Sequence, residues 1–454
     1  MFPTKNLARL LIKNHYKVTY LVPEECKEII LKLGANHYVK DGWNSKIESS
    51  ESLSFASEIV LRDVLKEKSE IAIKECISFL NSSNIKPDVI FADYFVAGVS
   101  TVAEYFDVPF AYFYFTMYDF PNETMHKSFL QAHFGFDDSV GITKFVSEAI
   151  WYSIFQFVGS GIQDTVNDIR SQLNLTDRFT SFPQLLSSYP VFTLLNSKYQ
   201  RSFISPNIQS LGIVESNEEE DPLPENIQNF IDSSSKDILY VAFGSMLTPS
   251  NDQLEILIDY LGNQTDYEII FARYPDGVAK SPNILSEKYI DQKAVLNNKH
   301  VKLFLSHCGL NSIIEAIEAE TVLVCYPLWR DQFFSAFGTG EMGISVTIND
   351  TLSKQGINAA FHNVKSNYLH FFKRIQKEKE LLLKMNGYEK IKNFVDQNGK
   401  RGTTRVHIKD PLSGLHISLI AAIVITSISL PLTICIGTCK FCWKSWHSGK
   451  RKKE

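Results

Sequence analysis

A segment in the second half of the chain, residues 302–332, concentrates side chains that can hold a phosphorylated ligand. The apolar run 301–306 predicts a buried strand, and a short loop containing His307 and Gly309 leads into a predicted helix over 311–319. Such a loop aims backbone N–H groups and the positive end of the helix at one point, which suits a diphosphate. Gly309 permits close approach of the ligand, and His307 can donate a further hydrogen bond.

Each of these side chains also has an ordinary structural role open to it. Asn311 or Ser312 can be a helix N-cap, and Ser312 with Glu315 fits a capping box. A single histidine at a strand end is usually structural. The combined pattern nevertheless favours ligand binding, because Asn311 and Ser312 also supply donors and the polar pair Asp331 and Gln332 follows the next predicted strand.

The elements around this segment alternate between strand and helix. In the second half we predict strand 238–243, helix 251–262, strand 268–272 and strand 322–326, with several helices out to about 396. In the first half we predict helix 6–12, strand 17–22, a helical stretch at 51–83, strands 88–92, 110–115 and 191–195, and mixed helices over 123–190. This alternation predicts parallel sheets covered on both faces. Because 454 residues exceed the usual size of one core, we expect two domains joined by the acidic segment 215–224.

Composition excludes several classes of function. The net charge is −5, and no basic stripe interleaved with aromatic residues runs through the large part of the chain, so nucleic-acid binding is not expected. The seven cysteines form no disulfide framework or zinc pattern, and Cys26, Cys76 and Cys325 are interpreted as small buried hydrophobes. The chain has no Asp-x-Asp triplet, so no metal is expected. The GxGxxG match at 338–343 follows a helical stretch, which excludes a dinucleotide fingerprint.

A transmembrane helix is predicted near the end of the chain. Residues 417–439 form a run of 23 residues without a charge, long enough as a helix for a hydrocarbon core of roughly 30 Å. Residues 440–454 are basic, which places this tail in the cytosol and the large part in the lumen. Lys450 and Lys452 resemble the di-lysine signal of endoplasmic-reticulum residents, while a basic cluster facing anionic lipids is the alternative. Lumenal sequons for N-glycosylation occur at Asn81, Asn122, Asn174, Asn263 and Asn349.

The segment 289–332 resembles the signature of the UDP-glycosyltransferase family, which includes the UDP-glucuronosyltransferases. The matching elements are Tyr289-Ile290-Asp291-Gln292, Ser306-His307-Cys308-Gly309, Asn311, Glu315 and Asp331-Gln332, at the family's spacing. Further matches are YVAFGS at 240–245, LLNSKYQ at 194–200, SPNIQSLGIV at 205–214 and PDVIFADYF at 87–95. The resemblance covers nearly the whole chain.

The resemblance implies an α/β fold of the GT-B type, with two Rossmann-like domains facing a cleft and one C-terminal transmembrane helix. The expected parts are an acceptor-binding domain at 1–214, a linker at 215–224, a UDP-sugar-binding domain at 225–396, a juxtamembrane segment at 397–416, the helix at 417–439 and the tail at 440–454. The implied reaction moves a hexose or glucuronic acid, with inversion, from a UDP-sugar co-substrate to a small lipophilic acceptor. No cofactor is implied, and the implied location is the endoplasmic-reticulum membrane.

The resemblance also assigns roles to individual residues. Tyr289 and Gln292 would face the uracil, and Glu315 would bind the ribose hydroxyls. The diphosphate would be surrounded by Ser245, His307, Gly309, Asn311 and Ser312. The sugar would be held by Asp331 and Gln332. Asp93 matches the aspartate that orients the family's catalytic histidine and stabilises its positive charge.

The beginning of the chain departs from the family pattern. The first twenty residues hold no signal peptide, because Lys5, Arg9, Lys13 and Lys17 interrupt them. A doubly wound sheet normally opens with its central strand before the first helix, so we expect that a signal peptide and one strand are absent here. The family's histidine would precede Phe2, and His15 is no substitute because it lies between the first helix and the second strand.

Other departures leave a second hypothesis open. Cys308 replaces the first glycine of His-Gly-Gly, and Tyr289 replaces the stacking tryptophan. Glu320 and Val322 stand at the usual glycine and proline, and Glu320 would cost about 1 kcal/mol if its backbone is left-handed. The alternative is a catalytically silent homologue that binds a UDP-sugar or regulates active relatives as a homo- or hetero-oligomer.

Overall fold

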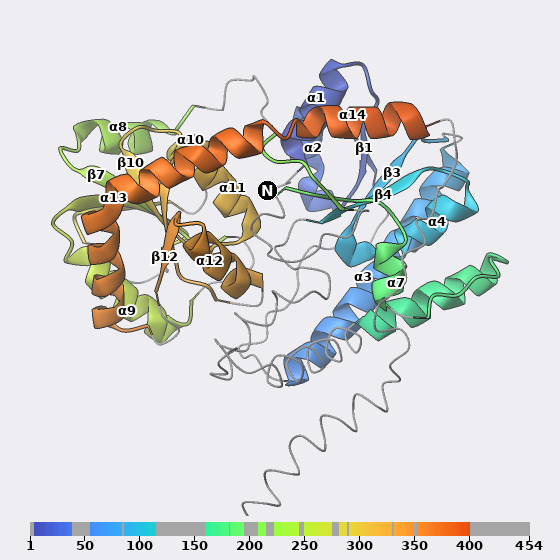
Figure 1. Ribbon diagram of the computed structural model, residues 1–454, viewed down its shortest axis with the longest axis horizontal. Helices are drawn as coiled ribbons and strands as arrows, with labels where there is room; N and C mark the ends of the chain where they lie inside the picture. The colour runs from blue at the N-terminus through green and yellow to red at the C-terminus, as the bar shows by residue number, and fades with distance from the viewer. Residues whose placement is uncertain are drawn as a thin grey trace, which may run out of the picture.

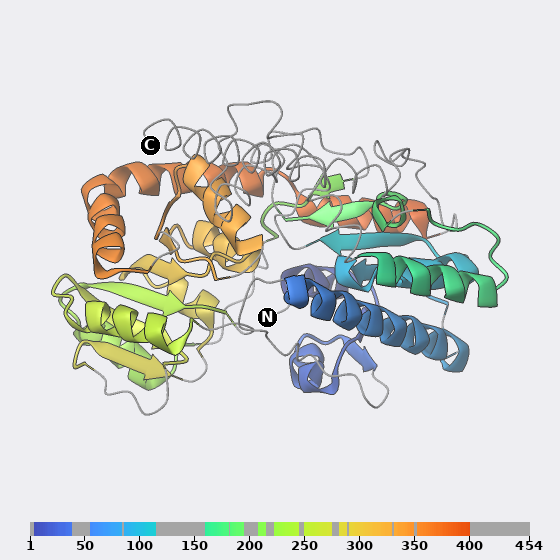
Figure 2. The ribbon, with the colours of Figure 1, turned by 90° about the horizontal axis from the view of Figure 1, so that it is seen from below.

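The computed structural model describes residues 4–38, 55–83, 86–114, 159–180, 182–194, 208–214, 222–244, 249–274, 281–287, 290–328, 331–348 and 352–399. Two α/β lobes lie side by side, the first half of the chain in one and most of the second half in the other (Figures 1 and 2). Within these ranges no helix has the length and apolar character needed to cross a bilayer. The predicted transmembrane helix at 417–439 and the tail fall outside them.

The second lobe is built on a six-stranded parallel sheet. Its strands are β7 (Asp237–Ala242), β8 (Tyr267–Ala272), β9 (Ile284–Glu287), β10 (Val301–Ser306), β11 (Val322–Cys325) and β12 (Ser345–Thr347). They lie in the order β12-β11-β10-β7-β8-β9, and every neighbouring pair is parallel. The central strands are nearly continuous runs of buried apolar residues, as expected for strands covered on both faces.

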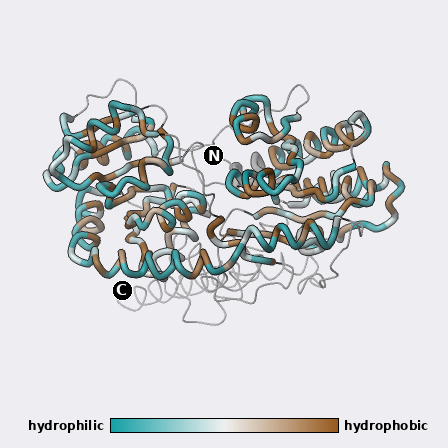
Figure 3. The backbone as a smooth tube through the Cα atoms, turned by 90° about the horizontal axis from the view of Figure 1, so that it is seen from above, coloured by the Kyte–Doolittle hydropathy of each residue, from teal (hydrophilic) through white to brown (hydrophobic). Residues whose placement is uncertain are grey.

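Helices cover both faces of this sheet. They are α8 (Glu225–Ser233), α9 (Asn251–Gly262), α10 (Gln292–Leu296), α11 (Leu310–Glu318), α12 (Asp331–Glu341) and α13 (Lys354–Leu383). Helix α9 begins with a capping box, in which Ser250 and Gln253 each bond the other's backbone N–H. Along the helices the chain switches repeatedly between hydrophilic and hydrophobic residues (Figure 3), because one face of each packs on the sheet and the other meets water.

The first lobe contains two separate parallel sheets among the described residues. Helix α1 (Lys5–Lys13) leads to β1 (Thr19–Leu21), which pairs with β2 (Asn36–Tyr38) after a short 3₁₀ turn (Glu24–Cys26) and α2 (Lys27–Lys32). A four-stranded sheet follows, with β3 (Ile90–Asp93), β4 (Phe110–Tyr114), β5 (Val191–Thr193) and β6 (Ile208–Ser210) in that order.

The four-stranded sheet separates two hydrophobic cores. Along β4 the side chains of Phe110, Tyr112 and Tyr114 enter one core, while Ala111 and Phe113 enter the other, as the alternation of a strand requires. The first core is covered by α3 (Phe55–Ser82), α4 (Val99–Tyr105), α7 (Phe182–Ser187) and the helical residues 159–172. The second core continues into the other lobe. The lobes thus share apolar packing.

The last described helix, α14 (Gly387–Asn398), returns to the first lobe (Figure 1). The Phe394 ring lies 5.8 Å from Phe91, and the Tyr16 hydroxyl donates to the Asp396 carboxylate. Where α13 meets the first lobe, Gly212 has a φ of +68°, and a Cβ there would be 2.1 Å from the Leu382 carbonyl oxygen. Only glycine fits that approach. Helix α14, most of which was predicted to belong to the donor domain, therefore packs on the four-stranded sheet of the first lobe. The predicted domain boundaries stay predictions.

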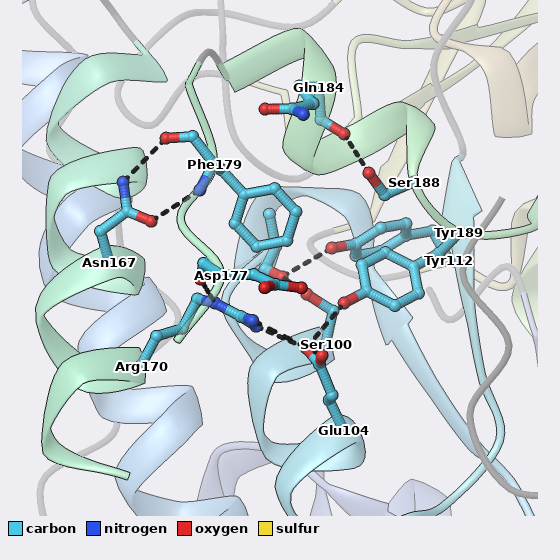
Figure 4. Close-up of polar contacts among 11 residues, drawn as sticks. Ser100, Glu104, Tyr112, Asn167, Arg170, Asp177, Phe179, Gln184, Ser188 and Tyr189 are labelled. Atoms are coloured by element: carbon cyan, nitrogen blue, oxygen red, sulfur yellow. Dashed lines mark hydrogen bonds and ion pairs between the residues drawn. The ribbon is translucent and has the colours of Figure 1, made fainter. Parts of the chain in front are cut away.

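A buried arginine ties the helical residues 159–172 to α4 (Figure 4). Arg170 is 1% exposed, and its guanidinium pairs with the Glu104 carboxylate and donates to the Asp177 carbonyl at 2.6 Å. It also lies over the Phe179 ring, 5.0 Å from the ring centre. The Tyr189 hydroxyl donates to the same carboxylate at 3.4 Å. A buried guanidinium with several acceptors is tolerated because its charge is paired and its donors are used.

Candidate functional site

The candidate site lies where the strand order of the second lobe reverses. Strands β7 and β10 are neighbours, and the chain proceeds outward from them in opposite directions, to β8 and β9 on one side and β11 and β12 on the other. In open α/β sheets, ligands bind beyond the carboxyl ends of the strands at such a point. Gly244 follows β7 and His307 follows β10 there. Helix α11 lies on the side of its lobe that faces the first lobe (Figure 1).

The His307 ring lies against two glycines. A Cβ on Gly244 would be 2.9 Å from its Cε1 atom, and a Cβ on Gly309 would be 2.6 Å from its Nε2 atom. Gly244 also has a φ of +79°, which a side chain would strain. His307 is half-buried, and loss of solvation lowers its pKa to about 4, against a smaller opposite effect of its hydrogen bond to the Ala242 backbone. The imidazole is therefore neutral near pH 7.

Cys308, the next residue, forms a disulfide that the sequence analysis did not predict. It is fully buried with a φ of +56°, and its sulfur forms a disulfide with Cys325, whose Cα lies 5.4 Å away. Its backbone N–H donates to the Ser306 hydroxyl at 3.0 Å. The interpretation of Cys325 as only a small buried hydrophobe is wrong, because both cysteines lie at the ends of adjacent strands. Cys26 and Cys76 are free cysteines, and only Cys76 is fully buried.

Helix α11 begins without a side-chain cap. Its N-cap residue is Gly309, so Asn311 and Ser312 lie inside the first turn. The N-cap and capping-box alternatives for these two residues are therefore wrong. The first-turn N–H groups point out of the helix end without a capping side chain, an arrangement that suits an anion.

Gln292, Ser312 and Glu315 form one hydrogen-bonded group. The Gln292 amide donates to the Glu315 carboxylate at 2.6 Å and to the Ser312 hydroxyl at 3.2 Å. Glu315 is 8% exposed, and this burial raises its pKa to about 7, against the opposing hydrogen bond from Gln292. The negative charges of Asp291 and Glu318 raise it further. A carboxylate of this kind is well suited to accept hydrogen bonds from hydroxyl groups of a ligand.

The structure describes only some of the remaining residues that were predicted to bind the UDP-sugar. Asp331 and Gln332 begin α12, and the Gln332 side chain accepts a hydrogen bond from the Leu328 N–H at 2.9 Å, which holds the loop after β11. Nothing is described of the Asp331 side chain, and Ser245 and Tyr289 lie outside the described residues. The structure thus brings Gln292, Ser312 and Glu315 together by contact, and His307 and Gly309 beside each other.

Asp93 is in the first lobe, at the carboxyl end of β3, with an exposed side chain. This is the strand end that the sequence predicted for it. His15 is exposed in the turn between α1 and β1, with a φ of +68°, where the sequence placed it. Within the described part of the chain, no group of three or more His, Cys, Asp or Glu residues is arranged to hold a metal ion.

Sequence reasoning missed two residues of the site. Gly244 supports the His307 ring, and the signal was the glycine directly before Ser245 in the YVAFGS motif. Cys325 forms the disulfide beneath the loop, and the signal was a pair of cysteines near the ends of two consecutive predicted strands. Neither signal identifies a site residue until it is known which strands are neighbours in the sheet.

Comparison with known proteins decides the family. The family model described as UDP-glucoronosyl and UDP-glucosyl transferase matches residues 10–374. The chain belongs to this family.

Among curated relatives, the ecdysteroid UDP-glucosyltransferase of Lymantria dispar multicapsid nuclear polyhedrosis virus is 32% identical over 154 residues, which are 33% of this chain and 30% of the relative. UDP-glycosyltransferase UGT4 of Dactylopius coccus is 23% identical over 306 residues, 63% of this chain and 60% of the relative. The chain therefore matches less than two thirds of either relative.

Solved glycosyltransferases share the fold of this UDP-glycosyltransferase family member. The kitacinnamycin glycotransferase superposes with a TM-score of 0.63 at 15% identity, covering 87% of this chain and 95% of that one. Arabidopsis thaliana UGT89C1, solved with UDP, gives a TM-score of 0.61 at 16% identity, covering 87% and 96%. The predicted α/β fold of the GT-B type is confirmed.

Proposed function

We propose that this chain transfers a hexose or glucuronic acid, with inversion, from a UDP-sugar to a small lipophilic acceptor. The observation that carries the proposal is the site at the strand-order reversal of the second lobe, where His307, the uncapped end of α11 and the Gln292–Glu315 pair lie at one sheet edge. A nucleoside diphosphate needs an anion site next to a hydroxyl acceptor, and this edge offers both.

Each part of the UDP-sugar is assigned to a subset of these residues. Glu315 accepts hydrogen bonds from the ribose hydroxyls, and Gln292 and Tyr289 face the uracil. The diphosphate lies against the first turn of α11, with donors supplied by Ser245, His307, Gly309, Asn311 and Ser312. The sugar is held by Asp331 and Gln332. His307 acts as a neutral hydrogen-bond donor, because the low pKa of its imidazole leaves it uncharged near pH 7. No metal or cofactor takes part, and the UDP-sugar is the co-substrate.

The first lobe supplies the acceptor side. Asp93 ends β3 and is an exposed residue. An aspartate in this position orients a general base and stabilises the positive charge that the base acquires. Asp93 is therefore the residue to which we assign the catalytic role.

We also propose that the chain is a single-pass protein of the endoplasmic-reticulum membrane, anchored by 417–439 with its lobes in the lumen. The uncharged run and the basic tail carry this proposal. The Cys308–Cys325 disulfide supports it, because disulfides persist in oxidising compartments. The sequons at Asn81, Asn174 and Asn263 are exposed and open to glycosylation. Protease added to sealed microsomes should then remove only the basic tail, whereas digestion of the lobes would contradict the lumenal placement.

The function is tested by UDP calorimetry and by transfer from UDP-sugars to a broad acceptor panel, using the full-length protein in detergent. Replacing His307 or Glu315 by Ala should weaken UDP binding about tenfold, because each removes a hydrogen-bonding partner of a charged or polar ligand group. In a protein that carries the general base that Asp93 would orient, Asp93→Asn should leave UDP binding intact and reduce turnover about a hundredfold or more.

Two controls make the result specific. Glu318→Gln changes a carboxylate one turn away on α11 that pairs with Lys293 at 2.7 Å. The comparison is made at about pH 9, where Glu315 is ionised in both proteins, and UDP affinity should then be unchanged. Unchanged UDP affinity in both His307→Ala and Glu315→Ala would show that the site is wrongly placed. Binding of UDP-sugar without transfer to any acceptor would instead support the catalytically silent homologue.

A further inference from the structure

The residue that follows His307 has an unfavourable backbone for its type. Cys308 has a φ of +56°, in the left-handed region, and its side chain is fully buried. L-residues other than glycine, Asn and Asp rarely adopt this conformation, because the Cβ approaches the following carbonyl oxygen. A loop with this residue and no further restraint would populate other conformations. The conformation that places His307 and Gly309 side by side therefore needs a local restraint.

The disulfide supplies a restraint at this position. Cys325 ends β11 and is the cross-strand partner of Ser306, the last residue of β10. Its bond to Cys308 links the loop after β10 to the end of the neighbouring strand. The closed ring contains the whole of α11, and with it Asn311, Ser312 and Glu315. Both cysteines are fully buried, so the bond lies under the loop and not on the surface.

The same sulfur also contacts the second element of the site. The Cys325 Sγ lies 3.7 Å from the Thr339 hydroxyl of α12, and Ser345 donates to that hydroxyl at 2.7 Å. Helix α12 begins with the candidate residues Asp331 and Gln332. The disulfide therefore lies between the loop that holds His307 and the helix whose first turn contains Gln332.

We propose that the Cys308–Cys325 disulfide is a positioning element of the donor site, so that the oxidation state of this pair sets the affinity for the nucleoside diphosphate. The inference rests on the proposed function. Formation of the bond joins the two sulfurs and releases two protons and two electrons, which a disulfide oxidant such as oxidised glutathione accepts to become two thiols. Reduction by a dithiol reverses the step. The oxidised pair holds the left-handed loop, and the reduced pair releases it.

The first measurement establishes the bond in the protein itself. The unreduced full-length protein is unfolded, treated with an alkylating reagent and mapped by mass spectrometry. Cys26 and Cys76 should be alkylated, while Cys308 and Cys325 should remain linked until a reductant is added. Alkylation of Cys308 in protein kept under oxidising conditions would overturn the proposal.

The second measurement asks whether the bond acts on donor binding. Cys325→Ala removes the bond and leaves a non-glycine residue at the left-handed position. UDP should bind about fivefold more weakly or worse, because only part of the population then holds the competent loop. Cys308→Gly combined with Cys325→Ala removes both the bond and the steric cost, and its UDP affinity should return to within about twofold of the parent. The KM for UDP-sugar should change in parallel, with kcat nearly constant.

Controls separate positioning from general stability. Cys26→Ala removes a cysteine of the first lobe and should not change UDP affinity, and thermal unfolding shows that each variant is folded. Parent protein refolded in dithiothreitol, so that the buried bond does not form, should bind UDP more weakly, while the Cys308→Gly/Cys325→Ala protein treated in the same way should be unaffected. Equal UDP affinity in Cys325→Ala and the parent, or no recovery in the double variant, would overturn the inference. A parent that binds no UDP would instead overturn the proposed function.

Discussion

The amide of Gln292 donates a hydrogen bond to the carboxylate of Glu315 across 2.6 Å, from the start of α10 to the middle of α11. The two residues are separated by strand β10 in the sequence, and each is a candidate contact of the nucleoside. Their pairing keeps a buried carboxylate supplied with a donor in the absence of ligand, which lowers the cost of its burial. Because Glu315 titrates near pH 7 and is a candidate contact of the ribose, its protonation should affect the binding of UDP.

UDP affinity should decrease as the pH falls below 7. Burial raises the pKa of Glu315 to about 7 in the free protein, and ribose hydroxyls donate best to its ionised form. Below that pH, binding must first remove a proton, so the affinity should fall by up to about tenfold per pH unit. Calorimetry from pH 5 to 8 measures this, with Glu315→Gln as the comparison because it keeps the shape and cannot titrate. A pH dependence shared equally by both proteins would exclude Glu315 as the source.

Glu315 should also make the free energy of unfolding depend on pH. Its contribution to stability should decrease as the pH rises, whereas UDP affinity increases. The folded pKa of about 7 lies above the ordinary value of 4.5, so the folded protein holds the proton more tightly. The stability that Glu315 contributes is therefore fully present below pH 4.5 and is lost as the pH rises through 7. In Glu315→Gln the free energy of unfolding should lack this component. Urea titrations of both proteins at pH 5 and 7.5 would detect it, and an equal pH dependence in both would contradict it.

Substitution of Gly244 should disturb His307 directly. A Cβ at this position would lie 2.9 Å from the ring, on a backbone with a φ of +79°, so Gly244→Ala must shift the imidazole and strain the turn. We expect UDP binding to weaken about tenfold or more, with a loss of stability of about 1 kcal/mol. Gly340→Ala is the matched control, because a Cβ there meets no atom within 4 Å. Equal UDP affinity in both variants would show that the ring position is unimportant.

Glu320 tests a strained position outside the donor site. Its φ is +59°, as its place at a family glycine suggested, and its carboxylate accepts hydrogen bonds from Gln376 at 2.9 Å and Lys379 at 3.0 Å on α13. Glu320→Ala keeps the strain and removes both bonds, so it should destabilise by about 1–2 kcal/mol. Glu320→Gly removes the strain as well and should be about 1 kcal/mol more stable than Glu320→Ala. Chemical denaturation ranks the three proteins, and an alanine variant at least as stable as the glycine variant would contradict the argument.

The buried pair of Arg170 and Glu104 should be costly to break from one side (Figure 4). Glu104→Ala leaves a guanidinium that is 1% exposed without its counter-charge, and we expect a loss of about 3 kcal/mol or more. Arg170→Met combined with Glu104→Leu removes both charges and should cost less than Glu104→Ala alone. A double-mutant cycle by urea denaturation measures the coupling. A double variant less stable than the single one would show that packing around Arg170 dominates.

The sequence by itself determined the longer or strongly apolar elements of the second lobe and the order of its site residues. Helix α9 and strand β10 have the predicted bounds, β11 ends one residue earlier than predicted, and α11 begins and ends one residue earlier than predicted. These elements are long or strongly apolar, so their patterns are clear within a few residues of chain. Strands β2, β6, β9 and β12 were not predicted, because their sequences (NHY, IQS, ILSE and SVT) contain no run of three apolar residues.

Only the tertiary structure decided which of these residues meet. Gln292 contacts Glu315 because α10 and α11 pack on the same edge of one sheet, and Cys308 reaches Cys325 because β10 and β11 are neighbours in register. The return of α14 to the first lobe was likewise invisible in the sequence. Residue type and spacing are local properties of the chain, whereas these contacts depend on strand order and helix packing, which distant segments fix together.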